Sequence, residues 1–110
     1  MAVKKITILY EDKEYTLEFN RNSIRQMERQ GFVARSIDDM PMSMIMSLVS
    51  GAFLMHHRNL RESEIEKIYA SIKNKENFLA KLSEMYAEPV MALMEEPEDD
   101  KGNAMWEASW

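Results

Sequence analysis

Apolar and polar positions alternate with a period of two near the start of the chain, between residues 3 and 19. One apolar run is Val3, Ile6, Ile8 and Tyr10, and the other is Tyr15, Leu17 and Phe19. Four charged residues, 11–14, separate the two runs. Alternation of β-branched and aromatic residues around a polar turn predicts a β-hairpin over residues 3–19. A lone hairpin is marginal in water, so we expect a helix to cover its apolar side.

After residue 20 the apolar spacing becomes that of helices, and it predicts four of them, over residues 22–30, 41–57, 62–74 and 75–95. Ser23 with Gln26 has the spacing of a capping box for the first helix, and Gly31 suits its end. Pro41 suits the first turn of the second helix. Pro89 removes a backbone donor within the fourth helix, so we expect a kink or a break there.

These elements predict an α+β protein in which an N-terminal hairpin packs on a bundle of about four helices. A chain of 110 residues has room for one modest core, which we place in residues 1–95. The net charge is −5, and the last 22 residues hold six acidic side chains against one lysine. We therefore expect residues 96–110 to form a flexible acidic tail.

The helix predicted over residues 41–57 is apolar nearly all round and unusually rich in methionine. The chain has eleven methionines, and those at positions 40, 42, 44 and 46 alternate, which spreads them around a helix. One interpretation is a central helix that its neighbours wrap. The other is an exposed, deformable surface that accepts apolar helices. Under the second interpretation, the candidate partner-binding residues are Met40, Met42, Met44, Met46 and Phe53.

Two tryptophans near the C-terminal end of the chain form a second candidate binding segment. Trp106 and Trp110 are four positions apart and would share a face in a helical turn. Tryptophan is a favoured anchor at protein interfaces, so an acidic tether that carries two of them is typical of a docking peptide. The alternative is that both fold back onto the core of their own domain.

The residues that catalysis or metal binding would need do not occur in a suitable pattern. Cysteine is absent, and there is no glycine-rich phosphate loop, zinc-protease motif or EF-hand loop. His56 and His57 are adjacent, so on a helix they would point about 100° apart and could not chelate one ion. We expect them at the polar end of their helix, where the dipole favours them. We therefore predict no enzyme activity, no cofactor and no catalytic or metal site.

Composition also argues against nucleic acid and membrane as partners. An acidic chain without a basic patch repels nucleic acid. Its longest apolar stretch, residues 40–55, is interrupted by proline, serines and glycine, and a bilayer span needs about 20 apolar residues. The first apolar run, Ile6 to Tyr10, is too short for a signal peptide.

Three segments give the chain a family resemblance. They are Leu17-Glu18-Phe19-Asn20-Arg21, which leads out of the hairpin, then Arg25-Gln26-Met27-Glu28-Arg29-Gln30-Gly31, and Phe78-Leu79-Ala80-Lys81-Leu82-Ser83-Glu84-Met85-Tyr86. With the acidic tail that ends in an aromatic residue, the pattern resembles the small tail assembly chaperones of long-tailed bacteriophages. The resemblance is greatest to those from phages and prophages of Gram-positive bacteria, and it extends over nearly the full chain.

The resemblance implies a role during virion assembly. Such chaperones coat the long, aggregation-prone helical tape measure protein and help to recruit tail tube subunits. It implies action in the cytoplasm of the bacterial host, absence from the mature virion and weak self-association of copies along one partner. Two other classes of function are compatible with the sequence. One is a structural component or adaptor of the virion tail, and the other is a small regulatory binding module of the antitoxin or inhibitor type.

Overall fold

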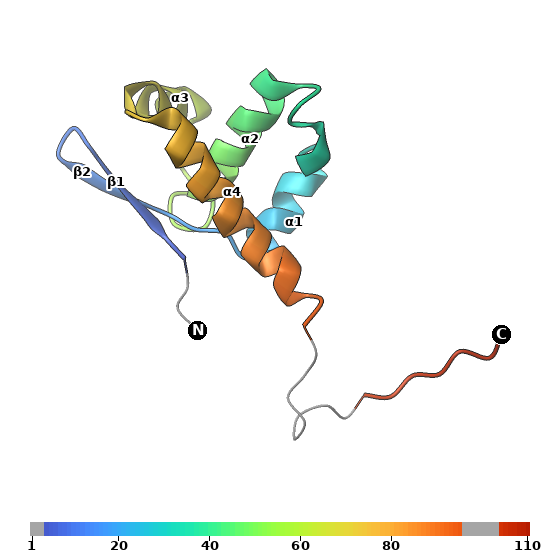
Figure 1. Cartoon of the computed structure of the whole chain (residues 1–110). Helices are drawn as coiled ribbons and strands as arrows, with labels where there is room; N and C mark the ends of the chain where they lie inside the picture. Colours follow the sequence, from blue (N-terminus) through green and yellow to red (C-terminus); the bar gives the residue numbers. More distant parts are fainter. Residues whose placement is uncertain (1–3, 96–103) are drawn as a thin grey trace.

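The chain folds as an antiparallel β-hairpin followed by four α-helices, which confirms the predicted α+β class. The structure, a computed structural model, describes residues 4–95 and 104–110. Its elements are β1 (Ile6–Tyr10), β2 (Lys13–Leu17), α1 (Arg21–Arg29), the 3-10 helix η1 (Ala34–Ser36), α2 (Pro41–Phe53), α3 (Glu62–Ser71) and α4 (Lys75–Ala92). In Figure 1 the hairpin projects from one side of the helices, and its tip lies beyond them.

The hairpin closes through a turn of two residues, which is tighter than the predicted turn of four. Glu11 and Asp12 both adopt positive φ angles, 49° and 63°, as in the turns that match the natural twist of paired strands. Lys13 therefore already belongs to β2 and pairs with Tyr10. Ile6 lies opposite Leu17 and Ile8 opposite Tyr15, so the apolar side predicted from the sequence is formed. The predicted hairpin began at Val3, which lies outside the described residues.

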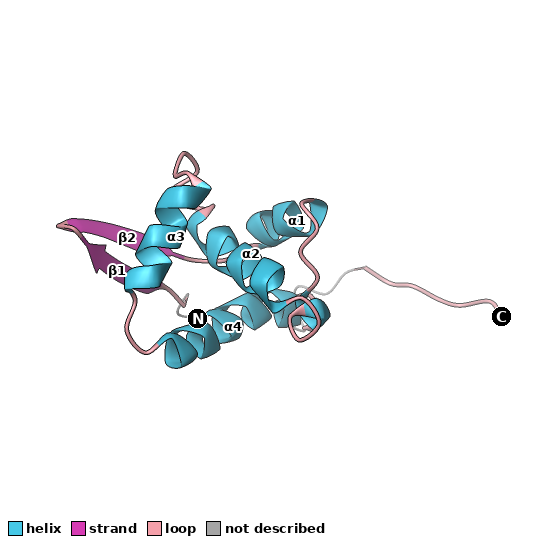
Figure 2. Ribbon diagram, turned by 90° about the horizontal axis from the view of Figure 1, so that it is seen from above, coloured by secondary structure: helices cyan, strands magenta, loops and turns pink. Residues whose placement is uncertain are grey.

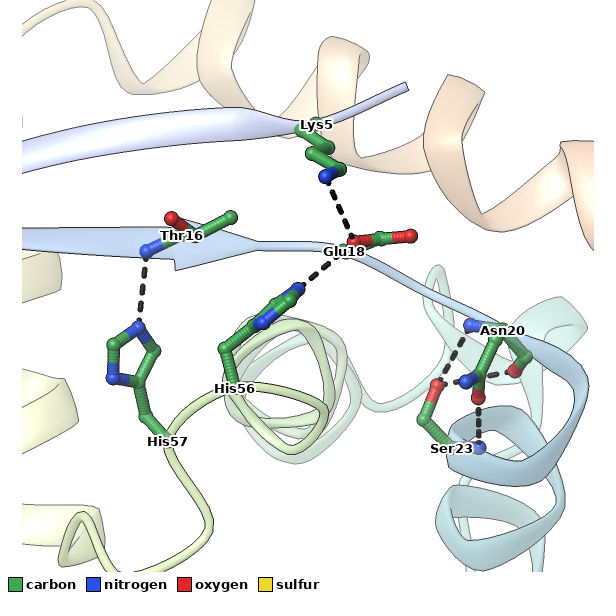
Figure 3. Close-up of polar contacts among 7 residues, drawn as sticks. All are labelled: Lys5, Thr16, Glu18, Asn20, Ser23, His56 and His57. Atoms are coloured by element: carbon green, nitrogen blue, oxygen red, sulfur yellow. Dashed lines mark hydrogen bonds and ion pairs between the residues drawn. The ribbon is translucent and has the colours of Figure 1, made fainter. Parts of the chain in front are cut away.

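The first helix begins one residue earlier than predicted, because Asn20 rather than Ser23 is its N-terminal cap. The Asn20 backbone is extended, and its side-chain oxygen accepts a hydrogen bond from the Ser23 N–H at 2.7 Å. In return the Asn20 N–H donates to Oγ of Ser23 at 3.0 Å (Figure 3). Ser23 is thus the third residue of the helix, and the predicted pairing of Ser23 with Gln26 is wrong.

The later helices start where the sequence predicts and end earlier. Pro41 occupies the first turn of α2, as expected, but α2 ends at Phe53 instead of residue 57. Asn74, with a left-handed backbone (φ 57°), separates α3 from α4. Pro89 lies inside α4, which continues to Ala92, so the helix does not end at the proline.

The core lies between the apolar side of the hairpin and the helices. Helix α2 contacts β2, η1 and the other three helices, and Figure 2 shows it between α1 and α4. The largest side chains that are fully buried are Phe53, Leu17, Ile68, Leu82 and Val49. Tyr86 of α4 joins two parts of this core, because its ring meets the rings of Phe19 and Phe32 edge-on at 5.7 and 5.4 Å.

The crossing of α1 and α2 depends on a glycine. Met27 of α1 is buried against the backbone of α2 at Gly51, and a Cβ atom at that position would overlap three side-chain atoms of Met27. Overpacking a filled core costs about 1–3 kcal/mol, which exceeds the gain of about 1 kcal/mol from replacing a helical glycine with alanine. Glycine at position 51 therefore fixes how closely the two helices approach.

We predict that Gly51→Ala lowers the free energy of unfolding by about 1 to 2 kcal/mol, measured by urea denaturation. The double variant Gly51→Ala/Met27→Ala is the control, because the smaller side chain makes room for the added methyl group. The double variant should lose less unfolding free energy than the sum of the losses in Gly51→Ala and Met27→Ala measured separately. Equal or greater stability of Gly51→Ala would contradict the close contact.

Candidate partner-binding surfaces

The methionines of α2 divide between the core and the surface. Met44 is 6% exposed and belongs to the core, and Met46 is half-buried against it. Met40, the residue before the helix, and Met42 lie at the opposite extreme, with exposed fractions of 51% and 88%. Each of the two interpretations of this helix therefore describes a different part of it. Met40 and Met42, at the start of the helix, are exposed, and from Met44 onward one side of the helix belongs to the core.

Two of the candidate partner-binding residues must be reassigned to the core. Phe53 is 1% exposed and its ring packs edge-on against Tyr15 at 6.0 Å. Met44 is equally enclosed, and its sulfur lies 3.4 Å from the backbone nitrogen of Val33. Neither side chain can reach a partner unless the domain opens. The helical spacing placed them on an apolar helix but did not show which side the neighbouring elements would cover.

The C-terminal end of α4 exposes a group of apolar side chains that the sequence analysis did not select. The group is Val90, Met91, Leu93 and Met94, with exposed fractions of 42%, 67%, 59% and 84%. We name it the α4-end surface. The sequence did contain an indication of this surface. Val90, Met91 and Met94 are apolar although they lie outside the apolar stripe that Phe78, Leu82, Met85 and Leu93 form on their helix.

A shallow groove adjoins the α4-end surface, between α1 and α4. It has a volume of about 130 Å³. Its apolar lining comes from Ile24, Pro89, Val90 and Leu93, and its polar lining from Arg21, Arg25 and Glu28. A groove with an apolar floor and two guanidinium groups suits a helix whose apolar stripe is flanked by acidic residues.

The two tryptophans of the tail segment are exposed in the structure. Trp106 is 85% and Trp110 is 102% exposed, and residues 104–110 have no regular secondary structure. Figure 1 shows this segment apart from the helices. The predicted flexibility of the acidic stretch falls on residues 96–103, outside the described part of the chain. The role of this segment as a docking peptide stays a prediction.

The two histidines join the end of α2 to β2, a role that the sequence did not reveal. Nε2 of His57 accepts a hydrogen bond from the backbone N–H of Thr16 at 3.0 Å (Figure 3). The His57 ring also meets the ring of Tyr15 edge-on at 5.2 Å. Burial, together with the charges of His56 and Lys13, lowers the pKa of His57 below 6.5, so the neutral ring that can accept this bond is favoured.

His56 binds the buried carboxylate of Glu18. Its Nε2 lies 2.8 Å from Oε1 of Glu18, whose side chain is 8% exposed, and Nζ of Lys5 lies 3.9 Å from the same oxygen. The Glu18 N–H donates to the carbonyl oxygen of Ala52 at 3.0 Å. Figure 3 shows both histidines, which lie in the turn that follows α2, reaching Thr16 of β2 and Glu18 just after it. A buried carboxylate with such partners stabilises a junction between elements, and the arrangement holds the hairpin on α2.

Among residues 4–95 and 104–110, no three acidic or histidine side chains come together in a way that could hold a metal ion. In the same residues, no helix has the length and apolar character needed to cross a bilayer.

Comparison with known proteins gives one match. A family model described as a domain of unknown function (DUF5055) matches residues 1–110. Neither the curated proteins nor the solved structures contain a match.

We predict that Met42→Glu leaves the melting temperature unchanged or slightly higher. The side chain is exposed, and a carboxylate in the first turn of a helix interacts favourably with the helix dipole, by about 0.3–1 kcal/mol. The matched control is Met44→Glu, which places the same charge in the core and should unfold the domain. Similar losses in both variants would contradict the division of α2 into surface and core.

We predict that protonation of His57 weakens the fold. The pKa of His57 in the folded protein lies below 6.5, the value expected in the unfolded chain. The contribution of the neutral ring to the free energy of unfolding is therefore complete above pH 6.5, and it is lost as the pH falls through the lowered pKa. The control His57→Gln keeps an acceptor for the Thr16 N–H but does not titrate. Urea midpoints from pH 7.5 to about 5 should fall more steeply in the wild type than in His57→Gln. Parallel curves would show that the bond does not depend on the neutral ring.

Proposed function

The chain belongs to the DUF5055 family, and we propose that it is a tail assembly chaperone of a long-tailed bacteriophage or prophage. In this role it covers apolar helical surface of the tape measure protein and helps to recruit tail tube subunits. It acts in the cytoplasm of the bacterial host and leaves the virion when the tail is complete. The partner class comes from the sequence resemblance, and the surfaces described above supply the physical means.

The observation that carries the proposal is the α4-end surface. Four large apolar side chains lie exposed within five consecutive positions, beside a groove with an apolar floor. Exposed apolar surface of this kind typically marks a binding site for another protein. Two of the four are methionines, whose unbranched side chains adapt to varied apolar partners. A chaperone that covers successive segments of a long helix requires such tolerance.

The charges of the adjoining groove favour one kind of helix. Arg21 and Arg25 line the groove beside Ile24 and Leu93. A partner helix that places apolar residues over Leu93 would set the residues on its flanks beside these guanidinium groups. Acidic flanks therefore bind better than basic ones. The preferred tape measure segments are those in which an apolar stripe lies next to glutamate or aspartate.

The tail segment, residues 104–110, supplies a second anchor that follows the α4-end surface in the sequence. It follows the α4-end surface after the acidic stretch, and both of its tryptophans are exposed. A tethered second contact raises overall affinity through effective concentration, without a larger primary surface. Each contact stays weak by itself, so the chaperone can be released as tube subunits assemble.

The first turn of α2 gives the molecule a second apolar surface for tube subunits. Met40 and Met42 are exposed there, and Val33, before η1, is 43% exposed. This surface involves other elements than the α4-end surface. A protein with two such surfaces can bind the tape measure protein with one and a tail tube subunit with the other.

The direct test is co-expression with fragments of the tape measure protein encoded by the same phage. The wild-type chain should keep the fragments in solution and co-purify with them. Met91→Glu/Met94→Glu should bind at least about tenfold more weakly, because it places charges within the α4-end surface. Its melting temperature should be unchanged, since both side chains are exposed.

The matched control for this test is Met40→Glu/Met42→Glu, which makes the same change on the other surface. It should retain tape measure binding and lose binding to the tube subunit. If the wild-type chain neither solubilises nor co-purifies with any fragment, the proposal fails. Mass spectrometry of purified virions separates a chaperone, which should be absent, from a structural tail component, which should be present.

We also predict that deletion of residues 96–110 leaves the melting temperature unchanged and weakens binding to tape measure fragments. Of the residues that the structure describes, the deletion removes two exposed tryptophans and none that belongs to the core. The measurements are thermal denaturation and pull-down with the same fragments. A large loss of stability would instead assign the tryptophans to the fold.

A further inference from the structure

The two edges of the hairpin differ in their hydrogen bonding. The outer edge of β2 bonds to the turn after α2, and within the described residues the outer edge of β1 remains open. The N–H groups of Thr16 in β2 and of Glu18 just after it point away from β1 and donate to His57 and to the carbonyl oxygen of Ala52. In an antiparallel pair, the residue opposite Thr16 must likewise turn its backbone groups outward. That residue is Thr7, and Leu9 follows two positions later in the same orientation.

In the part of the chain that the structure describes, no other element satisfies the outward groups of β1. Within residues 4–95 and 104–110, no hydrogen bond joins the backbone of Thr7 or Leu9 to another part of the chain beyond the hairpin. Both side chains are exposed, Leu9 by 75%. An open strand edge of this kind is a template for a further strand, and proteins that avoid pairing protect it with charges, proline or a covering element. The centre of β1, from Ile6 to Tyr10, has none of these devices.

Space for additional side chains lies beside this edge. A groove of about 320 Å³ follows β1 and is bordered by apolar residues at the junction of α3 and α4, namely Ile68, Ile72 and Phe78. Figure 1 shows the hairpin projecting from the helices. Side chains of a strand alternate between the two faces of a sheet. A strand added to β1 would therefore point every second side chain toward this groove and the others toward the opposite face, where Thr7 and Leu9 are exposed.

We infer that two copies of the chain pair through β1 to form a continuous four-stranded antiparallel sheet. The charge pattern of the strand selects this occupant. Lys4 and Lys5 precede β1, and Glu11 and Asp12 follow it. Within their own chain Lys4 also lies 3.6 Å from Glu88 and Lys5 lies 3.9 Å from Glu18, and both lysine side chains remain about half exposed to a second copy. When two copies lie antiparallel with Ile8 opposite Ile8, Thr7 of each faces Leu9 of the other in a hydrogen-bonded pair. Each pair of lysines then lies beside the acidic turn of the second copy.

The arrangement is self-complementary, and the assembly ends at two copies. A twofold axis through the two Ile8 residues relates the copies, so both free edges are consumed and no further copy can add. Two strands become four, which relieves the marginal stability of an isolated pair. An unrelated extended peptide could also meet the edge, but it would lack this reciprocal placement of lysines and acidic residues. The inference does not depend on the proposed role in tail assembly.

The test begins with the full-length protein across a range of concentrations. Sedimentation equilibrium should show a monomer–dimer equilibrium, and the amide signals of Thr7 and Leu9 should gain protection from hydrogen exchange as the dimer forms. The amide of Ile8, which points toward β2, should change little. A chain that remains monomeric up to about 1 mM would overturn the inference. So would a dimer in which the Thr7 and Leu9 amides exchange as in the monomer.

Charge variants test the pairing register. Thr7→Lys/Leu9→Lys places lysines opposite each other in both pairs, and Thr7→Glu/Leu9→Glu does the same with carboxylates. Each should weaken dimerisation by about tenfold or more, because like charges directly opposite are destabilising. An equimolar mixture of the two variants should recover a heterodimer. Dimerisation of either variant alone at the wild-type level, or failure of the mixture to pair, would overturn the register.

A proline variant controls for effects on folding. Leu9→Pro removes an outward N–H without removing a bond to β2, so circular dichroism should show an intact fold and sedimentation should show only monomer. Ile8→Pro is its matched control, because it removes a bond within the hairpin and should lower the melting temperature. A Leu9→Pro variant that still forms the dimer would contradict pairing through this edge.

Discussion

The junction between β2 and the C-terminal end of α2 determines the rest of the structure. A two-stranded sheet is barely stable alone, and this one gains three hydrogen bonds from residues 52, 56 and 57. These bonds hold the ring of Tyr15 against that of Phe53 and keep Leu17 buried in the core. Because the junction uses the outer edge of β2, it also decides which edge of the hairpin remains open.

The same junction explains where the apolar surfaces lie. The core gathers around the second half of α2, and both helix segments with large exposed apolar residues lie outside it. They are the first turn of α2 and the last turn of α4. Such residues add nothing to the core, and their exposure is the physical basis of the proposed binding role. In the proposed function, the exposed Trp106 and Trp110 act as two further apolar anchors.

The sequence predicted the architecture well and the surfaces only in part. Periods of two and of about four residues identified the hairpin and all four helices, because burial of one side of an element leaves a local pattern. The histidine contacts left no such pattern, since they join residues 38 and 41 positions apart. For the same reason, helical spacing identified an apolar α2 but assigned Met44 and Phe53 to a surface that β2 and η1 in fact cover.

The methionine methyl groups provide the most direct test of the central claim that the α4-end surface binds an apolar helix. NMR spectra of methyl-labelled full-length protein would be recorded with and without a tape measure fragment. The account predicts that the signals of Met91 and Met94 shift or broaden, while those of the buried Met27, Met44 and Met85 do not. An unchanged spectrum at a saturating concentration of fragments that cover the whole partner would contradict it. Shifts confined to the buried methionines would do so as well.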